Sequence, residues 1–251
     1  GSAGGLSFGE APAGPRGFSE RTMTPLPIAH RGWWWPEAKH QNNSSAFWAA
    51  AKAGYGLELD VRLWNGNDLV IQHGPRDHTL LLSAELSTLF TAPLLAWNLK
   101  DMAAAEHLTA FIRRYELVDK SVIFDHELAA REAGMPPHHG ARVLERFQGR
   151  GLLARASDRD ESLGEALIGP GMGVWLDAFE KDWVTAETIR TVHAAQKAAY
   201  VVSPELHGRP LDLALWKEWR EAEGICTDFP HLLAALQDGA PLEPVDPWWA
   251  P

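Results

Sequence analysis

Short apolar runs alternate with helical patterns along the chain, and this alternation restricts its fold more than any other feature. It predicts βαβ units that build a parallel sheet. Strands are expected at residues 26–29, 56–64, 93–100, 121–127, 151–157, 173–180, 198–208 and 225–230. The 251 residues, 45% of them hydrophobic, suffice for one large core and match the usual length of a barrel of eight strands. We therefore predict an α/β fold, a single (β/α)8 TIM barrel over residues 23–251.

Three local signals refine this prediction. The segment Ser44–Ala53 is rich in small and apolar residues and is followed by Gly54, which predicts a helix that ends there. Asn65-Gly66 lies between two apolar runs and predicts a hairpin turn. Thr185 precedes an amphipathic segment and is expected to cap the helix that follows.

The composition excludes several classes of protein. A net charge of −10 disfavours nucleic acids and anionic membranes as partners, because phosphates recruit basic surfaces. No apolar run approaches the roughly 20 residues of a membrane span, and the start lacks the apolar segment of a signal peptide. Cys226 is the only cysteine, which fits a reducing compartment. We expect a cytoplasmic location.

The first residues differ from the rest. Residues 1–22 are rich in Gly, Pro and Ser and show no periodicity, so we expect a disordered leader left from expression, without function. Met23 is the expected native start.

Polar side chains gather where the first strands end. His30 and Arg31 follow the first strand, and His73 follows the return from the hairpin. Glu58 and Asp60 are two residues apart in the strand GLELDVRLW, so they lie on one face of it. The flanking apolar residues indicate a buried strand, in which carboxylates need partners. Active sites of such barrels lie at the carboxyl ends of the strands, so these residues are the main site candidates.

These motifs, in this order, resemble the glycerophosphodiester phosphodiesterase family, whose sequences have His-Arg-Gly, then Glu-x-Asp, then a lone His after a strand. The matching segments here are HRG at 30–32, ELD at 58–60 and His73, and GICTDFPHLL is similar to the family's last strand. The resemblance implies a TIM barrel that cleaves a phosphodiester with one divalent cation. AWNLKD, VWLDAFEKDW and VVSPELHGR further resemble a divergent branch from bacterial surface-polysaccharide gene clusters.

The resemblance suggests a role for each residue of this set. His30 and His73 would share the acid and base roles, because imidazole titrates near neutral pH; which is the acid stays open. Arg31 offers a planar fork that matches two phosphate oxygens. Glu58 and Asp60 are oxygen ligands suited to Mg²⁺ or Ca²⁺, which would neutralise the phosphate.

One position departs from the family pattern. The phosphodiesterases typically have a glutamate as third metal ligand on the third strand, where this chain has Asn98. An amide oxygen can ligate a hard cation but brings no charge, so we expect weaker metal binding unless a carboxylate such as Asp177 helps. Lys100 matches the family's lysine and is expected to contact a phosphoryl oxygen.

Further candidates lie at the ends of the later strands. Arg155, Glu205 and His207 are expected to bind substrate or phosphate, although a salt-bridged barrel rim would show the same pattern. Asp228 is expected to orient its neighbours rather than to do chemistry. Trp33, directly after His-Arg-Gly, would either stack on a sugar at the mouth of the site or anchor its loop by packing.

The sequence thus predicts a metal-dependent phosphodiesterase for a glycerophosphodiester-like, sugar or polyol substrate, carbohydrate-linked if Trp33 stacks on it. Two alternatives stay open. One is a metal-independent, phospholipase C-like phosphodiesterase in which Arg31 and Lys100 replace the cation. The other is a non-catalytic barrel that binds a polysaccharide intermediate or a partner protein of that pathway; Asn98 leaves it open, and the two histidines speak against it. The oligomeric state stays open as well.

Overall fold

The computed structural model describes residues 24–34, 38–74, 77, 79–144 and 151–240, so the expected leader over residues 1–22 lies outside the described residues. The strands are β1 Leu26–Ala29, β2 Gly56–Trp64, β3 Asp68–Ile71, β4 Leu80–Leu81, β5 Leu95–Leu99, β6 Ser121–Phe124, β7 Leu153–Ser157, β8 Gly173–Asp177, β9 Ala198–Val202 and β10 Gly224–Thr227. The α-helices are α1 Ser44–Lys52, α2 Leu86–Thr91, α3 Ala104–Arg114, α4 His126–Glu132, α5 His138–Leu144, α6 Leu163–Ile168, α7 Ala186–Ala194, α8 Leu213–Glu218 and α9 Pro230–Gln237. Short 3-10 turns are η1 Ala38–His40, η2 Leu82–Glu85, η3 Val118–Lys120 and η4 Pro204–His207.

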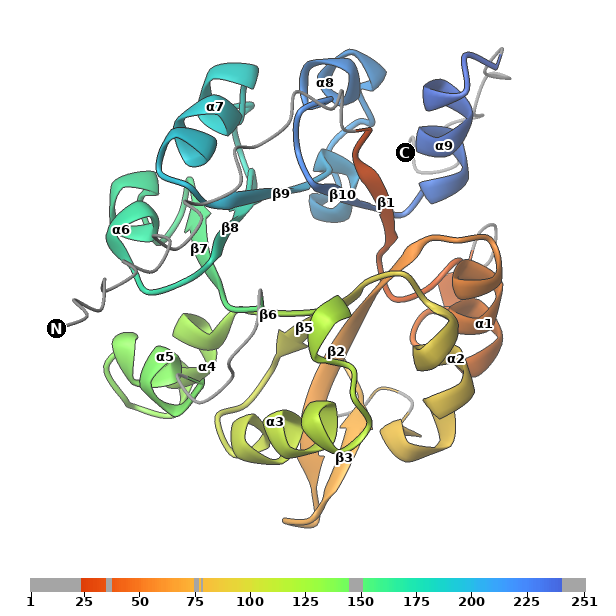
Figure 1. Cartoon of the computed structure of the whole chain (residues 1–251), viewed down its shortest axis with the longest axis vertical. Helices are drawn as coiled ribbons and strands as arrows, with labels where there is room; N and C mark the ends of the chain where they lie inside the picture. Colours follow the sequence, from red (N-terminus) through yellow and green to blue (C-terminus); the bar gives the residue numbers. More distant parts are fainter. Residues whose placement is uncertain (1–23, 35–37, 75–76, 78, 145–150, 241–251) are drawn as a thin grey trace, which may run out of the picture.

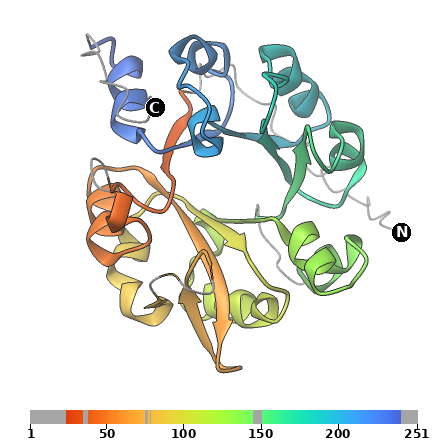
Figure 2. The same cartoon turned by 180° about the vertical axis from the view of Figure 1, so that it is seen from behind.

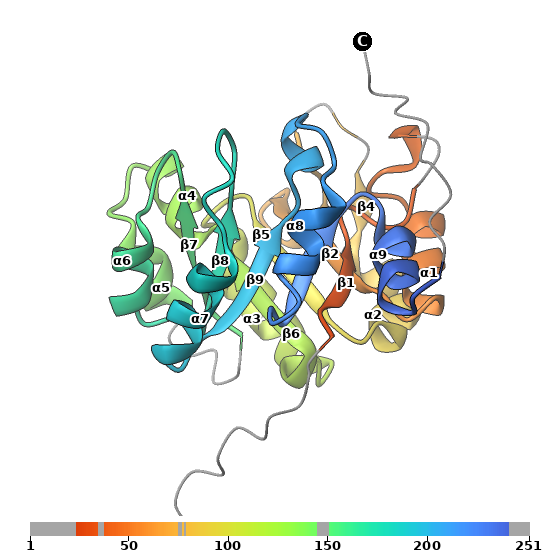
Figure 3. The ribbon, with the colours of Figure 1, turned by 90° about the horizontal axis from the view of Figure 1, so that it is seen from above.

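The parallel strands form one curled, barrel-like sheet with the helices outside it (Figure 1). β1 pairs with β2 and β10; the sheet continues from β2 to β5 and β6, and from β10 to β9, β8 and β7. Between β6 and β7, an isolated bridge from Ile123 to Leu152 takes the place of a ladder. The curl is also visible from behind (Figure 2), and in the view from above the strands lie between the helices (Figure 3). The expected α/β class and its parallel order are confirmed.

The hairpin expected after β2 is present. β2 pairs antiparallel with β3, and β3 pairs with β4, so the hairpin extends the sheet beyond its parallel strands. Asn65 and Gly66 have φ of 49° and 75°. Positive φ at both central residues is what a tight turn between twisted strands requires.

The two predicted helix signals are also confirmed. α1 covers nearly all of the predicted segment, with the Asn43 side chain accepting from the N–H groups of Ser45 (2.9 Å) and Ala46 (3.2 Å). Thr185 caps α7 by accepting from the N–H of Thr188 at 3.2 Å. In both cases the cap satisfies N–H groups that have no partner within the helix.

Five strands end earlier than predicted: β5 by one residue, β6, β8 and β10 by three residues each, and β9 by six. The cause is visible at β6 and β9. β6 stops at Phe124 because Asp125 has a left-handed backbone (φ 59°), and the next residue opens α4. β9 stops at Val202 because Pro204, two residues on, has no N–H to continue the ladder. The prediction that residues 203–208 extend the seventh parallel strand is therefore wrong, and Glu205 and His207 lie on the 3-10 turn η4.

The core has an inner and an outer part. The inner cluster comes from strands alone: Ile28, Ala96, Val122, Phe124, Leu153, Trp175, Val202 and Cys226. Trp175 fills it by stacking on Phe124 with ring centroids 3.8 Å apart. Leu57 and Leu59 instead belong to the outer cluster with helix residues, so the alternating Glu58 and Asp60 face inward. Within the described ranges, no helix is long and apolar enough to cross a membrane.

Candidate active site

The carboxyl ends of β1, β2 and β5 bring six predicted site residues together. We call them the β1–β5 cluster: His30, Arg31, Glu58, Asp60, Asn98 and Lys100. β2 and β5 pair in parallel with Asp60 opposite Asn98, and Lys100 follows β5 directly. The cluster exists because neighbouring parallel strands end at the same edge of the sheet.

Asp60 is the anionic centre of this cluster. Its carboxylate lies 3.2 Å from Arg31 Nε and 3.1 Å from Lys100 Nζ, and the Asn42 side chain donates to it at 3.1 Å. Burial alone would raise the pKa of Asp60, but the charges of Lys100 and Arg31 outweigh it and lower the pKa to about 2. Asp60 is therefore ionised at neutral pH, and its charge holds the side chains of Arg31 and Lys100 within the cluster.

Glu58 is buried beside Asp60 with fewer compensating contacts. Its carboxylate accepts from the backbone N–H of Arg31 and from the Asn98 side chain, each at 3.2 Å. Burial raises the pKa of Glu58, and the charge of Asp60 raises it further. Asn98 Oδ1 is buried and makes no hydrogen bond to any residue that the structure describes. An amide oxygen without a donor beside two carboxylates has the chemistry of a hard-cation ligand.

His30 is held by Asp228 at the end of β10. His30 Nδ1 lies 2.7 Å from Asp228 Oδ1, and the backbone N–H of His30 donates to the backbone carbonyl of Thr227 at 3.1 Å. Burial lowers the pKa of His30, but the Asp228 carboxylate outweighs this and the pKa is raised. The expectation that Asp228 orients its neighbours agrees with this contact.

His73 lies in a more open position. Its side chain is 43% exposed, and its Nδ1 is 3.7 Å from Asp77. Its backbone carbonyl accepts from the Arg62 side chain at 2.8 Å, which fixes the chain at this point. Burial lowers the pKa of His73, and the cations Arg31 and Lys100 lower it further against the opposing effect of the carboxylates. The neutral imidazole is therefore favoured.

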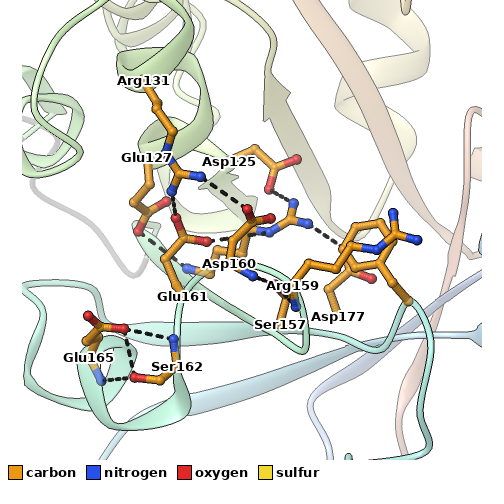
Figure 4. Close-up of polar contacts among 12 residues, drawn as sticks. Asp125, Glu127, Arg131, Ser157, Arg159, Asp160, Glu161, Ser162, Glu165 and Asp177 are labelled. Atoms are coloured by element: carbon orange, nitrogen blue, oxygen red, sulfur yellow. Dashed lines mark hydrogen bonds and ion pairs between the residues drawn. The ribbon is translucent and has the colours of Figure 1, made fainter.

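A second cluster lies at the ends of β6, β7 and β8 and includes Asp125 and Asp177, which Figure 4 labels. The buried guanidinium of Arg155 is at its centre. Arg155 pairs with Asp125 at 2.7 Å and with Asp177 at 3.2 Å. The other oxygen of Asp177 contacts His207, whose ring lies against Phe179 with centroids 4.0 Å apart. Burial lowers the pKa of Arg155, but the two carboxylates outweigh it. This arrangement is the salt-bridged rim that was the alternative to substrate binding.

The second cluster bears on three predicted roles. Both oxygens of Asp177 contact cationic or imidazole groups, so its expected help as a metal ligand has no contact in its favour. The substrate roles of Arg155 and His207 stay predictions for the same reason. Asp125, which pairs with Arg155, was not among the predicted site residues. Its position near the end of a predicted strand was the only sequence signal that pointed to it.

The Trp33 ring packs against two other rings. It meets Tyr55 edge-on at 5.5 Å between centroids and stacks near His231 at 5.6 Å. The neighbouring Trp34 donates its indole N–H to the His30 carbonyl at 3.0 Å. These contacts fit a loop anchor, the second of the two roles expected for Trp33, and its stacking on a sugar stays a prediction.

Two polar residues of the β1–α1 loop contact the β1–β5 cluster but were not predicted from the sequence. Gln41 accepts from Arg31 Nη1 at 3.1 Å, and Asn42 donates to Asp60. Asn42 has φ 56°, a left-handed conformation that asparagine tolerates. The Asn-Asn pair in the sequence was therefore a turn signal, but not one that indicated a site.

Metal binding has a partial set of ligands. Among the described residues, no group of three or more His, Cys, Asp or Glu side chains is placed to hold a metal ion. Glu58, Asp60 and the Asn98 oxygen together nevertheless offer oxygen donors of the type that Mg²⁺ and Ca²⁺ prefer. The donor set fits a hard cation. It supplies two negatively charged ligands and one neutral ligand, whereas the resembled family usually has three charged ligands.

No protein-family model and no curated protein matches this chain. A glycerophosphodiester phosphodiesterase structure from Parabacteroides distasonis is similar with a TM-score of 0.64 at 16% identity, covering 86% of this chain and 98% of that one. One from Agrobacterium tumefaciens gives 0.60 at 15% identity, covering 84% and 99%. A tryptophan synthase chain from M. tuberculosis gives 0.50 at 10% identity, covering 86% and 87%. Likeness at these identities shows a shared fold, and a fold alone does not select a chemistry.

Proposed function

We propose that this chain is a phosphodiesterase that hydrolyses a phosphodiester between small polyol or sugar groups, on a closed (β/α)8 barrel. The observation that supports this most is the His30–Asp228 pair at the edge where Arg31 and Lys100 are held by Asp60. An imidazole oriented by a carboxylate beside two cations suits proton transfer next to a phosphate. The glycerophosphodiester phosphodiesterases that share the fold support the same reaction class.

The two histidines then have different roles. The raised pKa of His30 favours the imidazolium, which can donate its proton to the leaving alkoxide. The lowered pKa of His73 favours the neutral ring, which can accept the proton of the attacking water. Arg31 and Lys100, each partly exposed, would hold the phosphoryl oxygens while the new O–P bond forms and the old one breaks.

These roles predict a bell-shaped pH dependence of kcat/KM that Asp228→Asn changes on one side. The acid limb follows deprotonation of His73 and the alkaline limb follows deprotonation of His30. The Asp228 carboxylate raises the pKa of His30, so its neutral replacement is expected to move the alkaline limb to lower pH and leave the acid limb in place. Rates measured from pH 5 to 9 check this. An unmoved alkaline limb would contradict the role of His30 as the acid.

A divalent cation is the second part of the proposal. Glu58, Asp60 and Asn98 would hold Mg²⁺ or Ca²⁺, which when bound would neutralise phosphoryl charge. The orphaned Asn98 oxygen supports this. The pairing of Asp60 with Arg31 and Lys100 supports the metal-independent alternative, because two cations already stand where a metal would act.

Asn98→Asp is expected to tighten Mg²⁺ or Ca²⁺ binding about tenfold, because it adds a charged oxygen ligand to the site. Calorimetric titration of the purified protein measures this without any substrate. Asn67→Asp, an exposed asparagine of the β2–β3 turn, is the matched control and should leave the affinity unchanged. Equal affinities of wild type and Asn98→Asp would favour the metal-independent mechanism.

The proposed function is tested by assaying glycerophosphodiesters and an aryl phosphodiester with Mg²⁺, with Ca²⁺ and with EDTA. Turnover that EDTA abolishes supports the metal-dependent reaction, and turnover that EDTA leaves intact supports the alternative with Arg31 and Lys100. Absence of both turnover and metal binding would contradict the proposal and favour a non-catalytic barrel.

A further inference from the structure

Glu205 has no role in the proposed acid–base scheme, yet its carboxylate contacts Thr227 and Asp228, and Asp228 holds His30. Glu205 sits on η4, just after β9 ends. One carboxylate oxygen accepts from the Thr227 hydroxyl and from the Asp228 N–H at 3.2 Å, and the other accepts from the Ser203 hydroxyl. Three donors therefore meet on one carboxylate. Its hydrogen-bonding capacity is directed at the protein rather than at a phosphate, which a carboxylate would repel.

The donors are themselves fixed. Ser203 is fully buried, and its oxygen accepts from the indole N–H of Trp216 in α8 at 2.9 Å. Thr227 is fully buried as well, and its oxygen accepts from the Phe229 N–H at 3.0 Å. The contacts form one connected chain from α8 through η4 to the end of β10. Buried networks whose members are all satisfied hold a single geometry.

The chain of contacts ends at the imidazole of His30. Glu205 binds the Asp228 backbone on one side, and the Asp228 carboxylate lies 2.7 Å from His30 Nδ1 on the other. A shift of the Asp228 backbone would carry its carboxylate away from the ring. We propose that Glu205 is a positioning residue: by holding the Asp228 N–H and the Thr227 hydroxyl, it fixes the Asp228 carboxylate against His30 and so orients the general acid. This inference rests on the proposed function.

The surroundings of Glu205 act on its charge in two opposing ways. Burial raises its pKa to about 7, against the opposing effect of the Ser203 and Thr227 hydroxyls that donate to it. Only the ionised carboxylate accepts all three hydrogen bonds, because a protonated oxygen would have to donate instead. With a pKa of about 7, the ionised form dominates above neutral pH, and there the three donors hold the carboxylate and the carboxylate holds Asp228.

Two substitutions at this position separate positioning from general stability. Glu205→Ala removes the acceptor, so we expect a lower pKa of His30 and a kcat reduced on the order of 10- to 100-fold with little change in KM. Glu205→Gln keeps an oxygen for Thr227 and Asp228 and offers an N–H₂ to Ser203. It is therefore expected to keep both the His30 titration and kcat close to wild type. NMR titration of the His30 imidazole and steady-state kinetics on the full chain measure these effects.

Glu223→Ala is the matched control. Glu223 also binds a backbone N–H, that of Ala199 at 2.6 Å, and pairs with His193, but it lies just before β10 begins, at the opposite end of that strand from Thr227 and Asp228. Its removal is expected to lower stability without moving the His30 titration.

An unchanged His30 titration and kcat in folded Glu205→Ala would overturn the proposal. If that variant does not fold, Thr227→Val removes one of the two bonds toward β10, and is expected to shift the His30 titration in the same direction. A titration unchanged in Thr227→Val as well would overturn it. Lack of turnover by the wild-type protein would count against the phosphodiesterase function alone, because the NMR titration needs no substrate.

Discussion

Replacing His30 by alanine is expected to lower kcat for phosphodiester hydrolysis by about 10³-fold, because the leaving alkoxide loses its proton donor. The side chain is oriented by a carboxylate 2.7 Å away, which also raises the pKa of the imidazole against the effect of burial. Alanine removes both the proton and the partner of Asp228. Added imidazole should restore part of the rate, since it can enter the space left by the ring and supply the proton.

The matched control is His193→Ala. His193 is also an imidazole beside a carboxylate, 3.2 Å from Glu223, but it lies at the end of α7, before β9 begins. Its removal is expected to leave kcat within about twofold of wild type. Equal losses in both variants would indicate a general effect on folding, and an active His30→Ala would refute the assignment of the acid. Thermal unfolding of each variant, measured alongside the kinetics, separates these outcomes.

Arg155→Met is expected to lower the free energy of unfolding by about 4 kcal/mol, because it leaves two buried carboxylates without their cation. The guanidinium is 4% exposed and pairs with Asp125 at 2.7 Å and with Asp177 at 3.2 Å. Methionine keeps much of the volume but none of the charge. For a chain of this size the loss corresponds to a fall in Tm of about 10 °C, measurable by calorimetry.

Two further variants test whether the loss comes from the uncompensated buried carboxylates. Arg190→Met removes an exposed arginine that pairs with Glu187 within α7, and should leave stability almost unchanged. Adding Asp125→Asn and Asp177→Asn to Arg155→Met should recover part of the loss, because no buried charge is then left uncompensated. A stable Arg155→Met protein with a raised KM would instead favour the substrate-binding role predicted for Arg155.

Several features could be predicted because their causes are local. The bounds of β1 and β2 match the prediction, since an apolar run and a period of two mark a strand within a few residues. The Asn65-Gly66 turn and the Thr185 cap follow from the φ angles and side-chain acceptors those residues supply. The inward direction of Glu58 and Asp60 follows from the same alternation.

Strand ends were less predictable where one residue changes the backbone. Asp125 ends β6 by adopting a left-handed conformation that its type permits but does not require. Pro204 was visible in the sequence, but whether the chain would resume its strand or turn could not be read from it. The side chains of Glu205 and His207 therefore lie on a turn, directed at partners that the strand prediction did not supply.

The sequence by itself determined the class of fold, the order of its strands and the residue types that gather at the ends of β1, β2 and β5. It did so because hydrophobic periodicity and turn chemistry act over a few neighbouring residues. Only the tertiary structure decided the partners. Arg155 pairs with Asp125, thirty positions earlier, and Asp228 meets His30 from the opposite end of the chain. Contacts near 3 Å depend on which strands become neighbours and how their side chains pack, and no local pattern contains that information.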